Sequence, residues 1–289
     1  MTDIKKAIIL VAGYGTRFLP VTKAIPKEML PLVDKPLVHF LAEEIVSAGL
    51  KDILLVTGKG KLAIEDYFDR APEVEHFLEI KGKGEALRIV REISSLASFG
   101  SVRQMEQKGV ADAVLAAKPF FDGESFAVLS GDDIIDAQPS ALAQMIAVYK
   151  KYRAPVTCLV EVTPENAHRY GVIDGVEVEP GVWKIKRAVE KPAPGTAPTN
   201  LATLTRFVLT PDFIPYLERV EPVHGELYIP PAIAAYAQDG HDFYGYVVKG
   251  TYYDCGDKLG YMRAVVDMGL KHPEIGEQFG AWLTEKYKK

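Results

Sequence analysis

The stretch Ala7-Ile8-Ile9-Leu10-Val11-Ala12-Gly13-Tyr14-Gly15 decides the fold class of this chain. Its first five residues are all apolar, which is typical of a strand buried on both faces of a parallel sheet. Apolar residues then recur at helical spacing over residues 36–48, and residues 53–57 form a second apolar run. Strand, helix and strand within about fifty residues predict one βαβ unit with a right-handed crossover. The sequence therefore predicts an α/β fold.

The rest of the pattern extends this sheet and adds a smaller part. Residues 61–98 are rich in Glu, Lys and Arg and predict two helices, broken near residues 71–72 and 82–84. After residue 164 the pattern changes to short β-rich pieces that alternate with turns, before a helical tail from about Gly260. The other predicted elements are strands at 125–129, 155–160, 171–173, 183–189, 201–209 and 243–248, and a helix at 140–152. We expect a Rossmann-like, mostly parallel mixed sheet flanked by helices, with a smaller β-rich part.

The composition is that of an ordinary globular protein. The chain has 289 residues, a mean hydropathy of +0.01 and 25% charged residues, values that exclude a disordered or collagen-like chain. Its formal net charge is −5 and it has no basic stripe, so nucleic acid is not an expected partner. Cys158 and Cys255 lie far apart, which excludes a cysteine-rich zinc site and favours a reducing compartment. The apolar stretch 7–12 is too short to span a membrane, so we expect a cytoplasmic protein with no membrane partner.

The glycine pair after the first strand suggests phosphate binding, because backbone N–H groups can converge on an anion where no Cβ intrudes. Two familiar motifs fail here: position 18 is Phe instead of the third glycine of G-x-G-x-x-G, and no Walker A motif is present. Thr16 offers a hydroxyl, Arg17 a planar fork for phosphate, and Lys27 a compact charge. A bare G-x-G favours a tight turn with ordinary surface cations, but the appended Thr16-Arg17 and residues 26–31 (PKEMLP) shift the preference to phosphate binding.

The extended pattern resembles the sugar-1-phosphate nucleotidyltransferases, and within them the bacterial UTP–glucose-1-phosphate uridylyltransferases. The resemblance rests first on residues 11–20 (VAGYGTRFLP) and 22–31 (TKAIPKEMLP). It continues in the family's order over almost the whole chain, at residues 103–104, 108–109, 131–133, 170–172, 190–192, 200–202, 225–226 and 253–256. The helical stretch from about 72 to 97 resembles an insertion of the uridylyltransferases that the thymidylyltransferases lack.

The resemblance implies one nucleotidyltransferase domain over residues 1–289. It would divide into a nucleotide-binding part (about 1–160), a sugar-phosphate-binding part (about 161–259) and C-terminal helices (about 260–289). The implied reaction is attack of a sugar-1-phosphate oxygen on the α-phosphorus of UTP, with release of pyrophosphate. Mg²⁺ is the implied cofactor, because it prefers one or two carboxylates together with phosphate oxygens and water. By resemblance, Asp132 and Asp254 are its ligands. For an isolated Asp at a strand end, a turn or helix-cap role would be the alternative.

The remaining site residues are also implied by the resemblance. The nucleotide would contact the residues around the first turn and a loop that follows residue 103: Ala12, Gly13, Gly15, Thr16, Gln104 and Gly109. An amide such as Gln104 can both donate to and accept from the edge of a pyrimidine, although a solvated loop amide is the ordinary alternative. The sugar would contact Gly171, Glu190 and Asn200. The catalytic cations would be Lys191 on the sugar phosphate, and Arg17 and Lys27 on the triphosphate.

Several positions depart from the family pattern. Uridylyltransferases usually carry Gly-His where this chain has Ala111-Asp112, Leu-Pro where it has Ser130-Gly131, and Thr-Asp where it has Pro230-Pro231. Thr205 replaces a glycine beside the sugar. The phosphate and metal residues are unchanged, so these departures bear on the choice of base and sugar and leave the reaction type intact.

The main prediction is therefore a Mg²⁺-dependent enzyme that makes UDP-glucose from UTP and glucose 1-phosphate. One alternative is a relative that uses another hexose 1-phosphate, or dTTP or CTP. Another is a non-catalytic paralogue that binds a nucleotide sugar, which loss of Asp132, Lys191 or Asp254 would have favoured. A dehydrogenase is disfavoured by the missing third glycine. We also expect a homodimer or homotetramer, because relatives commonly self-associate.

Overall fold

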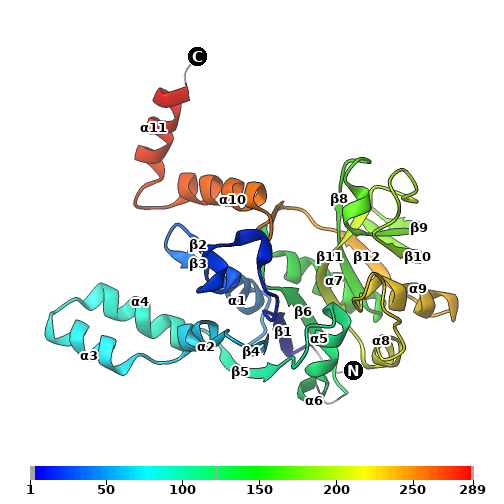
Figure 1. Cartoon of the computed structure of the whole chain (residues 1–289), viewed down its shortest axis with the longest axis horizontal. Coiled ribbons are helices and arrows are strands. Elements are labelled where there is room, and N and C mark those ends of the chain that lie inside the picture. Colours follow the sequence, from blue (N-terminus) through cyan, green and yellow to red (C-terminus); the bar gives the residue numbers. More distant parts are fainter. Residues whose placement is uncertain (1–3, 122, 288–289) are drawn as a thin grey trace.

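The computed structural model describes residues 4–121 and 123–287. The ends of the predicted single domain (residues 1–3 and 288–289) and residue 122 lie outside the described residues. Helices cover both faces of a central sheet, so the α/β prediction is confirmed (Figure 1).

One half of the sheet is parallel. Strands β5, β4, β1 and β6 lie side by side in that order, and each neighbouring pair is parallel. Their bounds are β5 Ser98–Arg103, β4 Asp52–Thr57, β1 Lys6–Leu10 and β6 Phe126–Ser130. The carboxyl ends of β1 and β6 therefore lie at the same edge, where open α/β sheets bind ligands.

The other half is mixed and folds back on itself. The order continues β11-β8-β12-β10-β9, and β9 also pairs with β11 through Thr203 and Gly171. Their bounds are β11 Leu201–Leu209, β8 Val156–Glu161, β12 Tyr244–Val247, β10 Val182–Glu190 and β9 Gly171–Glu179. Only β10 and β11 run against the other seven strands of this described sheet, as expected for a mostly parallel mixed sheet. The register between β11 and β8 is irregular between Thr203 and Phe207. The first residues of β11 also pair with β9, and its last residues pair with β6, so this strand belongs to both halves of the sheet.

Two layers of helices bury the two faces of the sheet. Leu37, Leu41 and Ile45 of α1 (Leu37–Ser47) and Met145 of α7 (Ala141–Tyr152) belong to one apolar cluster. On the opposite face, the cluster includes apolar side chains from α5 (Val110–Ala116), α8 (Ile214–Leu217) and α9 (Pro230–Gln238). Burial of these faces is the main force that holds the layers together.

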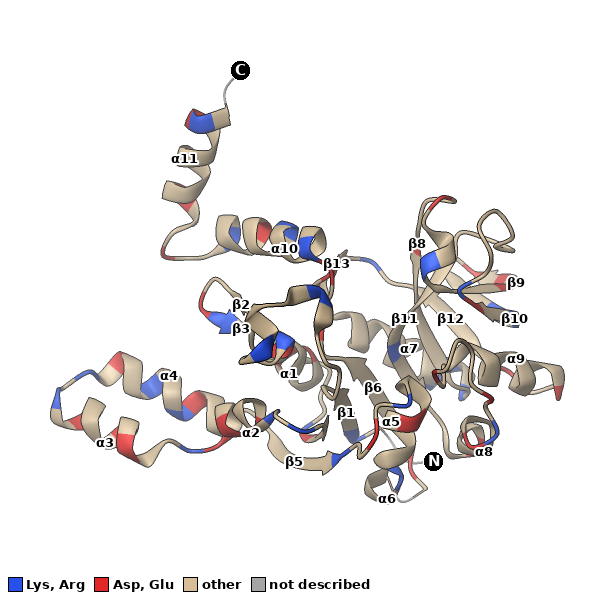
Figure 2. Ribbon diagram, viewed as in Figure 1, with Lys and Arg blue, Asp and Glu red and all other residues tan. Residues whose placement is uncertain are grey.

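The structure corrects the prediction for residues 61–98. This segment forms three helices, because both predicted breaks end a helix: α2 Leu62–Phe68, α3 Pro72–Ile80 and α4 Gly84–Ser95. Helices α3 and α4 project as a hairpin; α3 carries acidic residues and α4 carries both acidic and basic ones (Figures 1 and 2). The buried Glu75 carboxylate accepts hydrogen bonds from Arg70 and from Arg91, so the two helices are clamped by one carboxylate.

Several short elements were not predicted. Strand β5 has mostly exposed residues, because it lies at the edge of the sheet, and it therefore lacks an apolar run. A separate two-stranded sheet pairs β7 (Asp133–Asp136) with β13 (Thr251–Asp254). Helices α5 and α9 were also missed; both are rich in alanine and too short to display a clear period.

The predicted helical tail is confirmed. It comprises α10 (Lys258–Lys271) and α11 (Gly276–Tyr287), and α11 projects from the rest of the molecule (Figure 1). No helix within the described ranges is both long and apolar enough to cross a membrane. The predicted division near residues 160 and 260 stays a prediction, since the sheet runs without interruption through the first two parts.

Candidate active site

The first glycine turn closes over a lysine from the following loop. Gly15 has φ +67°, a conformation that glycine adopts without strain, and a Cβ there would lie 3.2 Å from Lys27 Cβ and Thr22 Cγ2. The Thr22 hydroxyl donates to the Gly15 carbonyl at 2.8 Å. Lys27 lies in the short 3-10 turn η3 (Lys27–Met29), and its Nζ is 3.7 Å from the position of a Cβ on Gly13. The sequence therefore places a cation directly beneath the backbone of the turn.

A cleft of about 370 Å³ opens beside this turn. Its lining includes seven of the residues that the family resemblance implied: Ala12, Gly13, Gly15, Thr16, Lys27, Gln104 and Gly109. They come from the carboxyl end of β1, from η3 and from the loop between β5 and α5. The cleft thus lies at the carboxyl edge of the parallel half of the sheet.

The far wall of the cleft is held by Gln104 and Gly109. The Gln104 backbone donates to the Thr57 carbonyl at 2.8 Å, while its side-chain Nε2 donates to the Gly109 carbonyl at 3.1 Å. Gly109 has φ +118°, and a Cβ there would lie 2.5 Å from the backbone of Leu227. Only glycine allows this close approach, so segment 225–229 can close one end of the cleft.

Two carboxylates from distant parts of the chain meet next to Lys27. In the β7–β13 pair, Asp254 lies opposite Asp133, and the Cys255 amide donates to the Asp132 carbonyl at 2.9 Å. A Cβ on Gly256 would collide with Asp132 Oδ2 and would lie 3.1 Å from Asp254 Oδ1. The two carboxylates therefore border one small space that the absence of a side chain at position 256 keeps open.

The charges around this space are unbalanced. Burial would raise the pKa of Asp132, but Lys27, whose Nζ lies 2.5 Å from Oδ2, and Ser130 hold that pKa below its usual range. The pKa of Asp254 is raised, first by burial and then by the Asp132 carboxylate. The ion pair with Lys27 thus offsets the charge of Asp132, whereas Asp254 is repelled by the neighbouring Asp132 carboxylate.

Asp133 and Arg17 lie beside these two carboxylates. Burial, and then the charge of Asp132, raise the pKa of Asp133 to about 7. The Tyr252 hydroxyl donates to Asp133 at 2.8 Å, so this carboxyl faces β13. Arg17 is exposed and does not line the cleft; its Nη1 lies 4.0 Å from Asp254 Oδ2.

A second pocket, of about 150 Å³, adjoins the cleft. Its lining includes two predicted sugar-binding residues, Gly171 and Glu190, together with Lys191, the predicted cation for the sugar phosphate. Val110 and Thr205 line both cavities, so the cavities meet at these two side chains. Burial raises the pKa of Glu190 to about 7 against the opposing pull of Lys191. A Cβ on Gly171 would lie 2.9 Å from Glu190 Oε2, so glycine leaves the carboxylate accessible.

The third predicted sugar residue is not part of this pocket. Asn200 is exposed immediately before β11 and does not line the pocket, and its carbonyl accepts a hydrogen bond from the Val162 amide at 3.0 Å. Its role stays a prediction.

Sequence reasoning assigned no role to several residues that line the site or hold its lining in place. The Tyr228 hydroxyl accepts from Lys191 Nζ at 2.6 Å and donates to Glu226 at 2.6 Å. Tyr228 lines the small pocket and Glu226 the cleft, so the segment that follows Gly225 serves both cavities. Asp112 accepts from Gln104 Nε2 at 2.7 Å. In the sequence, the departure from the family pattern at Asp112 was the feature that could have drawn attention to this residue.

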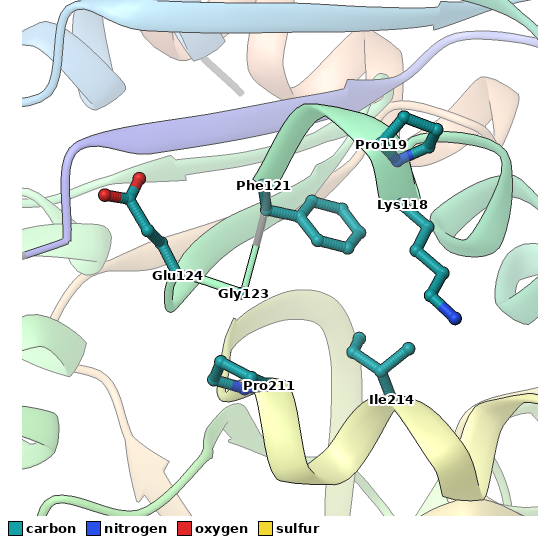
Figure 3. Close-up of a pocket in the computed structure, with 7 residues that line it drawn as sticks. All are labelled: Lys118, Pro119, Phe121, Gly123, Glu124, Pro211 and Ile214. Atoms are coloured by element: carbon teal, nitrogen blue, oxygen red, sulfur yellow. The ribbon is translucent and has the colours of Figure 1, made fainter.

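A third cavity, of about 390 Å³, lies away from these residues, between α6 (Lys118–Phe121) and the start of α8 (Figure 3). Phe121, Pro211 and Ile214 give it apolar walls. Its two charged groups already have partners, since Lys118 pairs with Glu218 and Glu124 pairs with Lys6. None of the predicted site residues lines it, so the paired cavities are the candidate active site.

The comparisons with known proteins agree with this geometry. A family model described as nucleotidyl transferase matches residues 6–269. The chain is 44% identical over 286 residues, 99% of either chain, to a UTP–glucose-1-phosphate uridylyltransferase of Staphylococcus epidermidis. The structure of a UTP-bound UGPase from Acinetobacter baumannii superposes on this chain with a TM-score of 0.89 at 38% identity. The superposition covers 98% of this chain and 99% of the other.

A UDP-glucose pyrophosphorylase complexed with UDP-glucose superposes with a TM-score of 0.85 at 40% identity, over 93% of this chain and all of the other. The family expected from the sequence is thereby confirmed. The paired cavities, the glycine turn and the full-length similarity lead to one conclusion: the chain belongs to the nucleotidyl transferase family, among the UTP–glucose-1-phosphate uridylyltransferases.

Proposed function

We propose that this protein transfers the uridylyl group of UTP to glucose 1-phosphate and releases pyrophosphate. The observation that carries the proposal is the junction of the two cavities at Val110 and Thr205, with Lys27 in the wall of the larger one. A nucleotide in the cleft and a sugar phosphate in the pocket would meet at this junction. The relatives' names supply the same two substrates.

The nucleophile needs no general base. The second pKa of a phosphate monoester is about 6, so the attacking oxygen of a sugar 1-phosphate is already ionised at neutral pH. The difficulty is that two anions must approach in line while negative charge moves onto the departing pyrophosphate. Catalysis therefore rests on positioning and on fixed positive charge.

We assign the triphosphate to the glycine turn. Backbone N–H groups at Gly13 and Gly15 and the Thr16 hydroxyl would contact phosphate oxygens, and Lys27 would face them from below the turn. Arg17 is exposed near Asp254, so it is free to turn toward phosphate oxygens at the mouth of the cleft.

The sugar phosphate is assigned to the smaller pocket. Glu190 would accept hydrogen bonds from two sugar hydroxyls, and Lys191, held by the Tyr228 hydroxyl, would pair with the phosphate. The bond that forms joins the sugar phosphate oxygen to the α-phosphorus, and the bond that breaks joins the α-phosphorus to the oxygen bridging to the β-phosphate.

The residues present fit a divalent cation. Asp132 and Asp254 border a space that a Cβ would fill, and the pKa of Asp254 is raised by burial and by Asp132, so an added positive charge there would be favourable. Two carboxylates suit Mg²⁺, because it completes its coordination shell with phosphate oxygens and water. When bound, Mg²⁺ supplies charge that offsets the negative phosphates.

One alternative has a specific observation in its favour. Thr205 lines both cavities and adds a hydroxyl where the family carries glycine, which favours a changed preference for the hexose phosphate. A non-catalytic nucleotide-sugar binder remains a second candidate, although Asp132, Asp254 and Lys191 are all retained.

The test is a pyrophosphate-release assay with UTP, Mg²⁺ and a panel of hexose 1-phosphates. We expect turnover with glucose 1-phosphate and no turnover when Mg²⁺ is removed by EDTA. Turnover with another hexose phosphate alone would support the first alternative. Binding of UTP without turnover of any sugar would support the second.

We also propose self-association as a homodimer or homotetramer. Met262 of α10 and Trp282 of α11 are each about half exposed, and α11 projects from the body (Figure 1). Exposed apolar side chains on a projecting helix favour an interface. A cytoplasmic location, suggested by the two free cysteines, likewise stays a proposal.

A further inference from the structure

The side chain of Gln104 has only one orientation that its surroundings allow. Its Nε2 lies 3.1 Å from the Gly109 carbonyl and 2.7 Å from Asp112 Oδ2. A carbonyl and an ionised carboxylate can only accept hydrogen bonds. If the amide were turned over, Oε1 would face both acceptors and leave them without a donor, at a cost comparable to that of a lost buried hydrogen bond.

This arrangement decides which atom a nucleotide meets. Gln104 is only 4% exposed yet lines the cleft, and its Nε2 is already used by Gly109 and Asp112. The atom left for a ligand is Oε1, an acceptor. A pyrimidine must therefore present a donor at the edge that meets Gln104.

Uracil and cytosine differ at this point. An acceptor opposite N3 of the base discriminates between them: uracil carries a hydrogen on N3 and can donate to Oε1, whereas cytosine has a lone pair there and carries its only donor on this edge at N4, where uracil has an oxygen. A buried pair of facing acceptors costs about as much as an unmade hydrogen bond. The fixed amide therefore favours uracil.

We propose that Asp112 is the positioning residue that fixes Gln104 as a uracil-selective acceptor and so excludes CTP. The inference rests on the proposed use of the cleft for the nucleotide base. Asp112 does not line the cleft, so it acts through Gln104 and makes no contact of its own with the base. Asp112 lies in the first turn of α5, next to Gly109, whose carbonyl accepts from the same amide nitrogen.

The structural alternative is that Asp112 only stabilises α5 through the helix dipole. That role would change the free energy of unfolding and would alter binding of UTP and CTP equally. A change in the ratio of the two affinities separates the two roles.

The experiment measures dissociation constants for UTP and CTP by calorimetry, together with kcat/KM for both nucleotides, in the wild type, Asp112→Ala and Asp112→Asn. In Asp112→Ala we expect the UTP:CTP preference to fall by about 10- to 100-fold, with weaker UTP binding and tighter CTP binding. Asp112→Asn should keep most of the preference, because its Oδ1 still accepts from Gln104. The effect should appear mainly in KM, with kcat for UTP nearly unchanged.

A double-mutant cycle with Gln104→Ala tests whether Asp112 acts through the amide. In the Gln104→Ala background, Asp112→Ala should leave the UTP:CTP ratio unchanged. An unchanged ratio in the single Asp112→Ala variant, or equal losses for the two nucleotides, would overturn the inference. If the wild type releases pyrophosphate from UTP while Asp112→Ala keeps the full preference, only this inference fails. If the wild type does not bind UTP, the proposed function fails and the inference fails with it.

Discussion

Lys27 Nζ lies 2.5 Å from Asp132 Oδ2, at the point where the loop after β1 meets the carboxyl end of β6. Burial alone would lower the pKa of Lys27 and raise that of Asp132, and their mutual attraction reverses both shifts. Both groups therefore stay charged at neutral pH. The pair joins the glycine-turn side of the cleft to the carboxylates, so changes at either residue are informative.

Replacement of Lys27 by Met should lower kcat/KM for UTP by a factor on the order of 10²–10³, because one fixed charge facing the phosphates is lost. The matched control is Lys23→Met, in the neighbouring 3-10 turn, where the side chain does not line the cleft. Pyrophosphate release measures both. Equal rates for Lys27→Met and Lys23→Met would remove Lys27 from the catalytic machinery.

Asp132→Asn should lower turnover by orders of magnitude, because the neutral amide is a weaker metal ligand where charge develops. Asp136→Asn, on β7 and paired with Lys271 at the surface, is the control. Turnover is followed against Mg²⁺ concentration, and a circular dichroism spectrum checks the fold. The metal assignment would be wrong if Asp132→Asn matched the wild type at limiting Mg²⁺.

The pH dependence of sugar binding should follow Glu190, whose pKa is raised to about 7 by burial. Above this pKa the carboxylate accepts hydrogen bonds from sugar hydroxyls, and below it the protonated group accepts fewer. The KM for glucose 1-phosphate should therefore rise as the pH falls through about 7 in the wild type.

Glu190→Gln should have a higher KM at pH 8 and a flatter profile across the same range. The substrate phosphate titrates with a second pKa of about 6 in both enzymes, so it cancels in the comparison. The KM for UTP serves as the internal control. If the KM for glucose 1-phosphate depended on pH in the same way in both enzymes, Glu190 would not be a residue that binds the sugar.

The largest stability effect should come from a buried ion pair behind the site. Arg206 is fully buried, its Nη2 lies 2.9 Å from Glu44 Oε2, and it also donates to the Asp133 carbonyl at 2.9 Å. Glu44→Ala should lower the free energy of unfolding by about 3–5 kcal/mol, because it leaves a buried guanidinium unpaired.

The matched change at an exposed pair is Glu218→Ala, which frees Lys118 and should cost at most about 1 kcal/mol. Urea unfolding measures both variants. Similar losses in the two would mean that the Glu44–Arg206 pair contributes no more than a surface contact.

Local patterns carried much of the prediction. The apolar run of β1, the helical period of α1 and the run of β4 each lie within one short segment, so they are readable from the sequence alone. The glycine turn with Lys27 is equally local, and its residues do line the cleft. Strand β5 escaped prediction because an edge strand exposes most of its residues and so shows no apolar run.

By itself, the sequence determined the α/β architecture, the glycine turn after β1 and the family, since each is carried by short segments of consecutive residues. The resemblance paired Asp132 with Asp254, but only the tertiary structure showed that both border one space, that Thr205 stands between two cavities, and that Asp112 holds Gln104. The first two depend on the pairing of strands that are far apart in the sequence, and the third on how a helix start packs against a loop. Strand pairing and packing of this kind leave no periodic trace in the amino-acid sequence.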